Sequence, residues 1–434
     1  MALSDDTAHG NTWLAKPMYP ESLAHIKPFQ PYRYSAKAGD PSRLVTQPYD
    51  KINPELQAKY LAASPYNLVR IILGERHDSD NESDNVYTRA ARYLEDWIRD
   101  GVLAQDAAPG LYAYFQEFEV PDSGERLTRK GFIGIGKIED YSAGVVYRHE
   151  RTLSGPKKDR MELLRHTRAH FGQLFMLYPD PEGAIDRLLD ESTGAAPLLN
   201  IADDYGARHC LWPITDPARV ARIQELMEPK KLLIADGHHR YETALAYRND
   251  HPDDEAARYV MMTLVNMHSP GVKVLATHRV LRNLEHFDAV HFFEKAVKAG
   301  WSVSACESIQ RLKERLATPD PKRVQIGVVT EGDIRLMQHL RKEGQLDVPV
   351  LHQDVLGGLL GVTDEAVRDE KHIKYVRGID AAVAEVENGA QIAFLLEPTP
   401  VDAMAGIAFA GGVMPQKSTD FYPKLLSGLT IYHL

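Results

Sequence analysis

A short apolar run that passes directly into a helical pattern is the sequence feature that most constrains this fold. The stretch LLIADGHHRYETALAYR covers residues 232–248. Its first four residues are apolar and few enough for one buried strand, while Ala244, Leu245 and Tyr247 have a spacing compatible with a helix. We therefore expect a strand that ends near Asp236, followed at once by a helix, as in an α/β protein.

The polar residues at this corner, 236–240, are the first candidate site. In α/β proteins the carboxyl end of a strand and the amino end of the next helix form a crevice, where free backbone N–H groups attract anions, especially phosphate. If these residues had a purely structural role, His238 would be capped and Arg240 would pair with an acidic residue at the surface. The concentration of Asp236, two histidines and Arg240 at one seam favours a functional site instead.

The remaining patterns predict a mixture of helices and strands. Helices are expected over 84–103 and 159–178, and strands over 110–120, 129–140, 257–268, 323–330, 389–398 and 404–412. The first two strands are joined by a turn and should pair antiparallel. The predicted fold class is therefore α/β of mixed α+β character, with large mixed-sheet regions.

Charge and cysteine content exclude several classes of function. The chain of 434 residues has a formal net charge of -10, whereas a surface for nucleic acid needs an excess of Lys and Arg. A small anionic ligand in a local basic pocket remains possible. Cys210 and Cys306 are far apart and form no CxxC motif, so neither a disulfide framework nor a structural zinc site is expected.

The amino-terminal residues lack the basic start and apolar stretch of a secretion signal, and no segment has the length of a membrane span. We therefore expect a cytoplasmic protein with a small-molecule substrate, without nucleic-acid or membrane partners. The sequence leaves its oligomeric state open.

Two further segments are rich in polar residues. YRHERTLSGPKKDR, residues 147–160, gathers charged side chains around a Ser-Gly-Pro turn, either as a solvated loop before a helix or as part of a site. GGVMPQKST, residues 411–419, nearly spells a phosphate-binding loop, but Gln416 replaces the required glycine and Pro423 follows too soon for a long helix. Lys417 could still bind an anion together with Ser418 and Thr419.

Several ordered motifs resemble one bacterial family. The segments IKPFQPYRY, QPYD, PYNLVRIILGE, HERT, PKKDR, ADGHHRYETAL, THR (277–279) and MPQKSTDFYPKLLSG are similar to those of the domain-of-unknown-function 1015 family, from about Ile26 onward. The family name implies no activity.

The segment DGHHRYETA is also similar to the nucleotide-handling motif of the ParB/sulfiredoxin superfamily. Sulfiredoxins have a reactive cysteine where this chain has His238, so their thiolate chemistry is excluded. Free serine kinases match residues 236–240 one by one. This resemblance implies a ParB/sulfiredoxin-like nucleotide-binding core that phosphorylates L-serine to O-phosphoserine with ATP or ADP and Mg²⁺. We expect a polar lead-in over 1–25, this core with insertions over 26–285, and a C-terminal α/β region over 286–434.

The resemblance and the motifs together suggest roles for individual residues. Asp236 would bind Mg²⁺ or orient a hydroxyl, Glu150 would accept the proton of the acceptor hydroxyl, and His239 would act in catalysis as well as in phosphate binding. The expected phosphate ligands are Gly237, His238, His239, Arg240, Lys158, Lys417, Ser418 and Thr419. The expected contacts to the amino acid are Arg33, Tyr49, Asp50, Arg151 and Thr152.

Two other functions fit the same residues. His238, His239 and Asp236 could ligate a metal that activates water, as in a metal-dependent phosphoesterase. Alternatively, the protein could bind a nucleotide as a sensor without catalysing any reaction.

Overall fold

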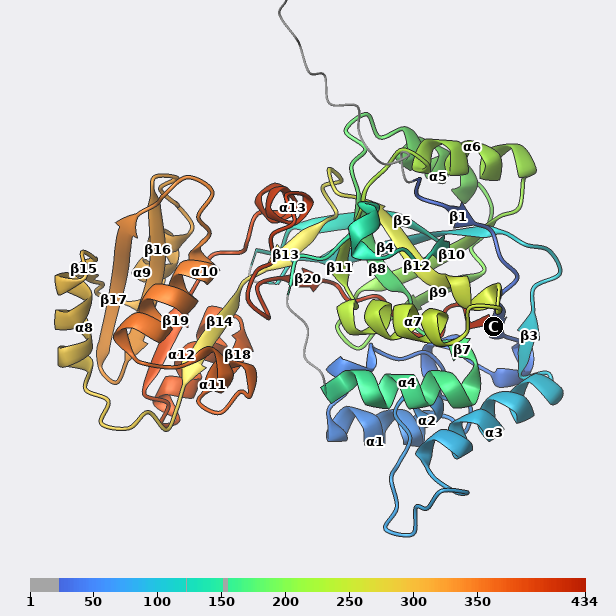
Figure 1. Cartoon of the computed structure of the whole chain (residues 1–434), viewed down its shortest axis with the longest axis horizontal. Helices are drawn as coiled ribbons and strands as arrows, with labels where there is room; N and C mark the ends of the chain where they lie inside the picture. Colours follow the sequence, from blue (N-terminus) through green and yellow to red (C-terminus); the bar gives the residue numbers. More distant parts are fainter. Residues whose placement is uncertain (1–22, 122, 151–154) are drawn as a thin grey trace, which may run out of the picture.

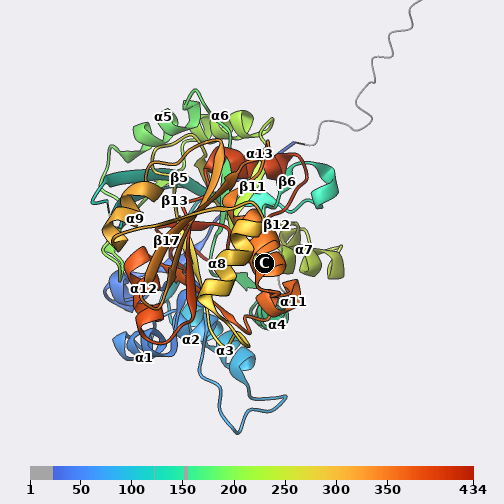
Figure 2. The same ribbon diagram turned by 90° about the vertical axis from the view of Figure 1, so that its left-hand side faces the viewer.

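The computed structural model describes residues 23–121, 123–150 and 155–434, and these residues form two lobes (Figure 1). The core lobe comprises the described residues up to 275 together with 397–434, and is built on a nine-stranded sheet. The second lobe, residues 277–396, is built on a six-stranded sheet. Figure 2 looks onto the second lobe, with the core lobe behind it.

The nine-stranded sheet is mixed. Strand β6 pairs in parallel with β11, and β8 pairs in parallel with β12. All other neighbouring strands of this sheet pair antiparallel. Its strands, in spatial order, are β6 (Val146–Tyr147), β11 (Leu232–Asp236), β8 (Leu174–Tyr178), β12 (Tyr259–Asn266), β5 (Arg126–Lys137), β4 (Leu111–Glu119), β10 (Arg208–Ile214) and β9 (Leu199–Ala202), with β1 (Ile26–Lys27) beside β5.

Each face of this sheet is covered by a different part of the chain. Helices α5 (Ala184–Asp190), α6 (Pro217–Met227) and α7 (His238–Asp250) contribute to the hydrophobic cluster on one face. Helix α13 (Val401–Phe409) and apolar side chains of residues 414–432 pack in the cluster on the other. Because the sheet is buried on both faces, every residue of the central strand β12 is buried, and all but Thr263 and Asn266 have apolar or aromatic side chains.

Four helices form a further layer of the core lobe (Figure 1). They are α1 (Pro54–Ala63), α2 (Val69–Ile72), α3 (Val86–Arg99) and α4 (Gly155–Thr167). Three two-stranded ribbons complete the lobe: β2 (Tyr32–Tyr34) with β3 (Leu103–Gln105), β7 (Ala169–His170) with β21 (Tyr432–His433), and β13 (Lys273–Leu275) with β20 (Asp420–Tyr422). No helix within the described ranges is long and apolar enough to cross a bilayer.

The second lobe has an antiparallel sheet between two apolar clusters. The strand order is β15 (Ser302–Ala305), β17 (Asp333–Leu340), β16 (Arg323–Thr330), β19 (Ile392–Leu395), β14 (Thr277–Leu281) and β18 (Ile373–Arg377). The surrounding helices are α8 (Ala289–Lys298), α9 (Ile309–Leu316), α10 (Asp347–Val350), a π-helical segment Leu351–Leu359, α11 (Asp364–Arg368) and α12 (Ile379–Glu387).

The expected corner at residues 236–240 is confirmed, since β11 ends at Asp236 and α7 begins at His238. The antiparallel pair of β4 and β5 is confirmed as well. The helix expected over 159–178 is wrong beyond Thr167, because the apolar run LFMLY is fully buried as strand β8. The strand expected over 404–412 is also wrong: Met404, Ala405 and Ala408 form one buried face of helix α13.

The expected division placed all residues after 286 in one C-terminal region, but the structure divides them between the two lobes. After β19 the chain returns to the core lobe, where Phe421, Leu425 and Leu429 pack with the nine-stranded sheet. The segment between α13 and Leu429 therefore runs past the carboxyl end of β11, and this places its polar residues beside the corner.

Candidate functional site

A cleft of about 760 Å³ lies where the two lobes meet. The core lobe lines it with the β11–α7 corner, with a short 3-10 turn at Tyr49–Lys51 and with the segment 416–424. The second lobe contributes Thr277 and residues around β18. Six cationic and five acidic side chains line this cleft, a positive balance in a chain whose net charge is -10. The cleft is therefore suited to an anionic ligand.

Helix α7 opens onto this cleft without a capping side chain. Its N-cap is Gly237, at φ +97°, where a Cβ atom would lie 3.0 Å from Arg240 Nη2 and 3.1 Å from Leu174 Cδ2. Glycine is therefore required for both conformation and space. The first N–H groups of a helix have no partner within the helix, so those of His238 and Arg240 can bind an anion.

A chain of ion pairs crosses the cleft from the corner to the second lobe. Lys424 Nζ lies 3.3 Å from Asp236 Oδ1 and 3.2 Å from Asp420 Oδ1. Arg377 on β18 donates to Asp420 Oδ2 at 2.6 Å. Arg240 Nη2 contacts Asp236 Oδ2 at 3.2 Å.

These contacts determine the charge of the corner. Burial by itself would raise the pKa of Asp236, but Lys424, Arg240 and Lys51 hold it well below its usual range. Burial likewise opposes the charge of Lys424, and Asp236 and Asp420 more than compensate by raising its pKa. Both groups are therefore ionised at neutral pH.

Two buried imidazoles lie behind the corner. His149 Nδ1 is 2.8 Å from the Ile234 carbonyl, and its Nε2 is 2.7 Å from Thr419 Oγ1. The rings of His149 and His238 are 4.8 Å apart, and His238 Nε2 is buried without a hydrogen-bond partner among the described residues. Burial, together with the neighbouring His149, lowers the pKa of His238 to about 3. An unpartnered buried nitrogen beside a free helix end indicates a ligand site.

Glu150 connects this cluster to the segment 416–424. Its Oε1 accepts hydrogen bonds from the N–H and Oγ1 of Thr419, both at 3.1 Å, and its Oε2 accepts one from the N–H of Lys417 at 3.3 Å. Burial would raise the pKa of Glu150, but His149, His238 and the Thr419 N–H together hold it at about 2. The carboxylate is therefore ionised and well supplied with donors.

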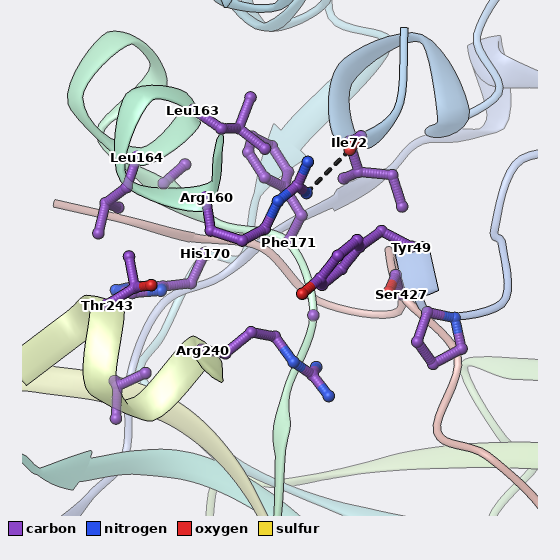
Figure 3. A pocket seen from close by; sticks show the side chains of 14 residues that line it. Tyr49, Ile72, Arg160, Leu163, Leu164, His170, Phe171, Arg240, Thr243 and Ser427 are labelled. Carbon is purple, nitrogen blue, oxygen red and sulfur yellow. Dashed lines mark hydrogen bonds between the residues drawn. The ribbon is translucent and has the colours of Figure 1, made fainter. Parts of the chain in front are cut away.

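A second, smaller cavity of about 70 Å³ lies next to the cleft (Figure 3). Tyr49 and Arg240 line both spaces. Most other walls are apolar, with Ile72, Leu163 and Phe171 among them, and the Arg160 guanidinium lies 4.1 Å from the centre of the Tyr49 ring.

The structure brings most of the expected site residues together. The cleft is lined by Tyr49, Asp50, Glu150, Asp236, Gly237, His238, His239, Arg240, Lys417 and Thr419. Three others do not line it. Arg33 pairs with Asp106 at 2.7 Å in the β2–β3 ribbon, Lys158 lies on α4, and the Ser418 hydroxyl donates to the Pro415 carbonyl at 2.6 Å. Arg151 and Thr152 lie outside the described residues.

Sequence reasoning missed Lys51, Arg377, Asp420 and Lys424. Asp420 and Lys424 stand in the quoted motif MPQKSTDFYPKLLSG, and Lys51 directly follows QPYD. The position of these three residues in or beside the quoted motifs could have indicated that they belong to the site. Arg377 had none, because its role depends on contact between the two lobes.

The buried state of His238 predicts a pH effect on stability. The unfolded imidazole titrates near 6.5, while the folded one titrates near 3 beside His149, Glu150, Asp236 and His239. Between these values only the unfolded chain binds the proton, so the group's contribution to stability falls as the pH falls. We expect the stability difference between wild type and His238→Asn to shrink by about 1 kcal/mol per unit below pH 6.5. Urea unfolding at pH 7.5, 6.5 and 5.5 measures this; a constant difference would contradict it.

Comparison with known proteins gives one family and several solved structures. The family model described as "Protein of unknown function (DUF1015)" matches residues 26–356. A free serine kinase in complex with AMP is 12% identical, with a TM-score of 0.35 over 66% of this chain and 89% of that chain. A mutant free serine kinase in complex with ADP is 13% identical, with a TM-score of 0.36 over the same shares.

SbnI with a C-terminal truncation, from Staphylococcus aureus, is 10% identical, with a TM-score of 0.35 over 68% of this chain and 87% of that chain. The search of curated proteins found no match. Both resemblances expected from the motifs, to the family and to free serine kinases, are thus found again, although similarity at this level gives no information about chemistry. Because the family model matches well over half of this chain, the chain belongs to the DUF1015 family.

Proposed function

We propose that the cleft binds ATP or ADP and transfers a phosphoryl group to the hydroxyl of a small amino acid, with L-serine as the first candidate. The observation that carries this proposal is the uncapped start of α7, which opens onto a cleft with six cationic side chains. The residue-by-residue match of 236–240 with the free serine kinase motif supports it. In the same proposal, the corner and its sheet form a ParB/sulfiredoxin-like core.

Phosphoryl transfer requires positioning and positive charge more than covalent chemistry. In the proposed complex, the N–H groups of His238 and Arg240 hold the donor phosphates. Lys417 and Lys424 neutralise their charge from the opposite segment. His238 Nε2, which has no partner among the described side chains, supplies one further polar contact.

The residues present fit a loosely held Mg²⁺. This ion usually takes one or two carboxylates together with substrate phosphates, and when bound it would neutralise charge on the phosphates. Asp236 fits as the protein ligand, since its side chain is 28% exposed and lines the cleft. No group of three or more metal-ligating side chains occurs within the described ranges. The geometry therefore does not favour a phosphoesterase in which His238, His239 and Asp236 alone hold a metal.

Tyr49 and Asp50 form the part of the cleft assigned to the acceptor. Both belong to the turn at Tyr49–Lys51, and the small cavity lies behind Tyr49. The Asp50 side chain is 39% exposed, and its ion-pair contact to Lys51 is long, at 3.9 Å. It can therefore accept a hydrogen bond from the amino group or the hydroxyl of a bound amino acid.

The test is incubation of the purified protein with L-serine, Mg²⁺ and either ATP or ADP, followed by mass spectrometry for O-phosphoserine. We expect product with at least one donor. Arg240→Gln should reduce it strongly, while Asp190→Asn, which changes an exposed ion pair with Lys130, should not. Nucleotide binding by calorimetry without any phosphorylated hydroxy amino acid would indicate a sensor and contradict the kinase.

A further inference from the structure

Arg279, in the motif THR at 277–279, is buried in the second lobe behind the cleft. Only 1% of its surface is exposed. Its guanidinium donates to the carbonyls of Thr277 and of Lys417, the latter at 2.9 Å, and lies 3.4 Å from His352 Nε2. No carboxylate within the described ranges forms an ion pair with it. A buried guanidinium held by carbonyl groups calls for a functional reason, because burial of such a charge is costly.

The residue that Arg279 reaches has an uncommon backbone conformation. Lys417 lies at φ +57°, the left-handed region that non-glycine residues rarely adopt. Both of its backbone polar groups are held: its N–H by Glu150 of the core lobe at 3.3 Å, and its C=O by Arg279 of the second lobe at 2.9 Å. Such conformations persist where surrounding contacts determine them, and they concentrate at functional sites.

We propose that Arg279 is a positioning residue, which together with Glu150 holds Lys417 so that its ammonium group faces the transferring phosphoryl group. This inference rests on the proposed function and deepens it, since it makes the second lobe part of the phosphate site.

Three points support the positioning role of Arg279. The planar fork of a guanidinium can reach two carbonyl groups at once, which an ammonium group cannot do in the same geometry. Burial lowers the pKa of Arg279 to about 10, while Tyr375 and Glu150 favour its charged form, so it stays charged at neutral pH. The neighbouring Gln416 is also tied to the second lobe, since its Nε2 donates to the Val367 carbonyl at 3.0 Å.

The proposal is tested by a double-mutant cycle on phosphorylation of the acceptor, with Arg279→Met, Lys417→Ala and the double variant. We expect each single variant to lower kcat about a hundredfold, as for the loss of one preorganised charge contact, with KM for the acceptor unchanged. Because Arg279 acts through Lys417, the double variant should be no slower than Lys417→Ala. Effects that multiply would overturn the proposal. Arg279→Lys should lower kcat as much as Arg279→Met does. If Arg279→Met does not fold, Arg279→Lys takes its place in the cycle.

Arg341→Lys is the matched control, because Arg341 also binds two carbonyl groups of the second lobe, those of Gln345 and Arg323, both at 2.8 Å, without contacting the cleft. A crystal structure of Arg279→Met, or of Arg279→Lys, gives a readout that needs no turnover. We expect residues 416–419 to shift and Lys417 to leave positive φ; an unchanged segment would overturn the positioning role. If wild type makes no O-phosphoserine, the proposed function fails, and this structure still decides the role of Arg279.

Discussion

Replacement of Asp236 by asparagine is expected to reduce turnover by about a thousandfold, because it removes the carboxylate proposed to hold Mg²⁺ and orient the phosphates. Asparagine keeps the shape of the side chain but carries no charge. The measurement is kcat for O-phosphoserine formation at saturating nucleotide and Mg²⁺. Activity within threefold of wild type would contradict the assigned role of Asp236.

The same variant should lose stability. Lys424, whose side chain is 10% exposed, would keep Asp420 as its one contacting carboxylate among the residues that the structure describes. Breaking a fully buried pair costs about 3–5 kcal/mol, and the partial exposure of Asp236 reduces the expected loss to about 2 kcal/mol. Asp190→Asn is the matched control: Asp190 pairs with Lys130 at 2.7 Å on the surface, where both side chains are about a third or more exposed. Its loss should stay below about 0.5 kcal/mol in urea unfolding.

The corner could be predicted from sequence because its determinants are local. A short apolar run, a glycine and a helical run follow one another within seventeen residues, so periodicity alone places Asp236 at the end of β11 and His238 at the start of α7. The β4–β5 hairpin could be predicted for the same reason.

Two elements could not be assigned from periodicity. The run LFMLY continues a helical spacing, yet it forms β8 because β11 and β12 pair on either side of it and bury it completely. The residues around 404–409 are apolar enough for a strand, but they meet the sheet as one face of helix α13. Short apolar runs are compatible with both structures, and tertiary packing decides between them.

The site residues divide in the same way. Residues of the corner and of the other quoted motifs, such as Glu150 and Lys417, line the cleft as expected, whereas Arg33 was expected there and instead pairs with Asp106. Apart from the motif THR, which contains Arg279, nothing in the sequence indicated the second lobe's contribution, because Arg377 and Arg279 reach the segment 416–424 across a gap in sequence of at least 40 residues. Contacts of this kind follow from how two lobes pack, which no local pattern encodes.

The identity of the general base gives the last prediction. Sequence reasoning assigned this role to Glu150, which is ionised but has both oxygens occupied by the N–H groups and hydroxyl of Lys417 and Thr419. With a pKa of about 2 it also has little affinity for a proton. Asp50 lines the same cleft, and its ion-pair contact among the described residues is a long one, to Lys51 at 3.9 Å. We therefore expect Asp50 to accept the hydroxyl proton.

Asp50→Asn should lower kcat by about 10²–10⁴-fold, the usual contribution of a general base, with the affinity for ADP unchanged. Glu150→Gln should instead weaken ADP binding and lower kcat together, because an amide nitrogen would face the N–H groups that Glu150 now accepts and release the segment that carries Lys417. Calorimetry with ADP and steady-state kinetics separate these two patterns. If Asp50→Asn keeps full turnover while Glu150→Gln loses it at unchanged ADP affinity, the proton goes to Glu150 after all.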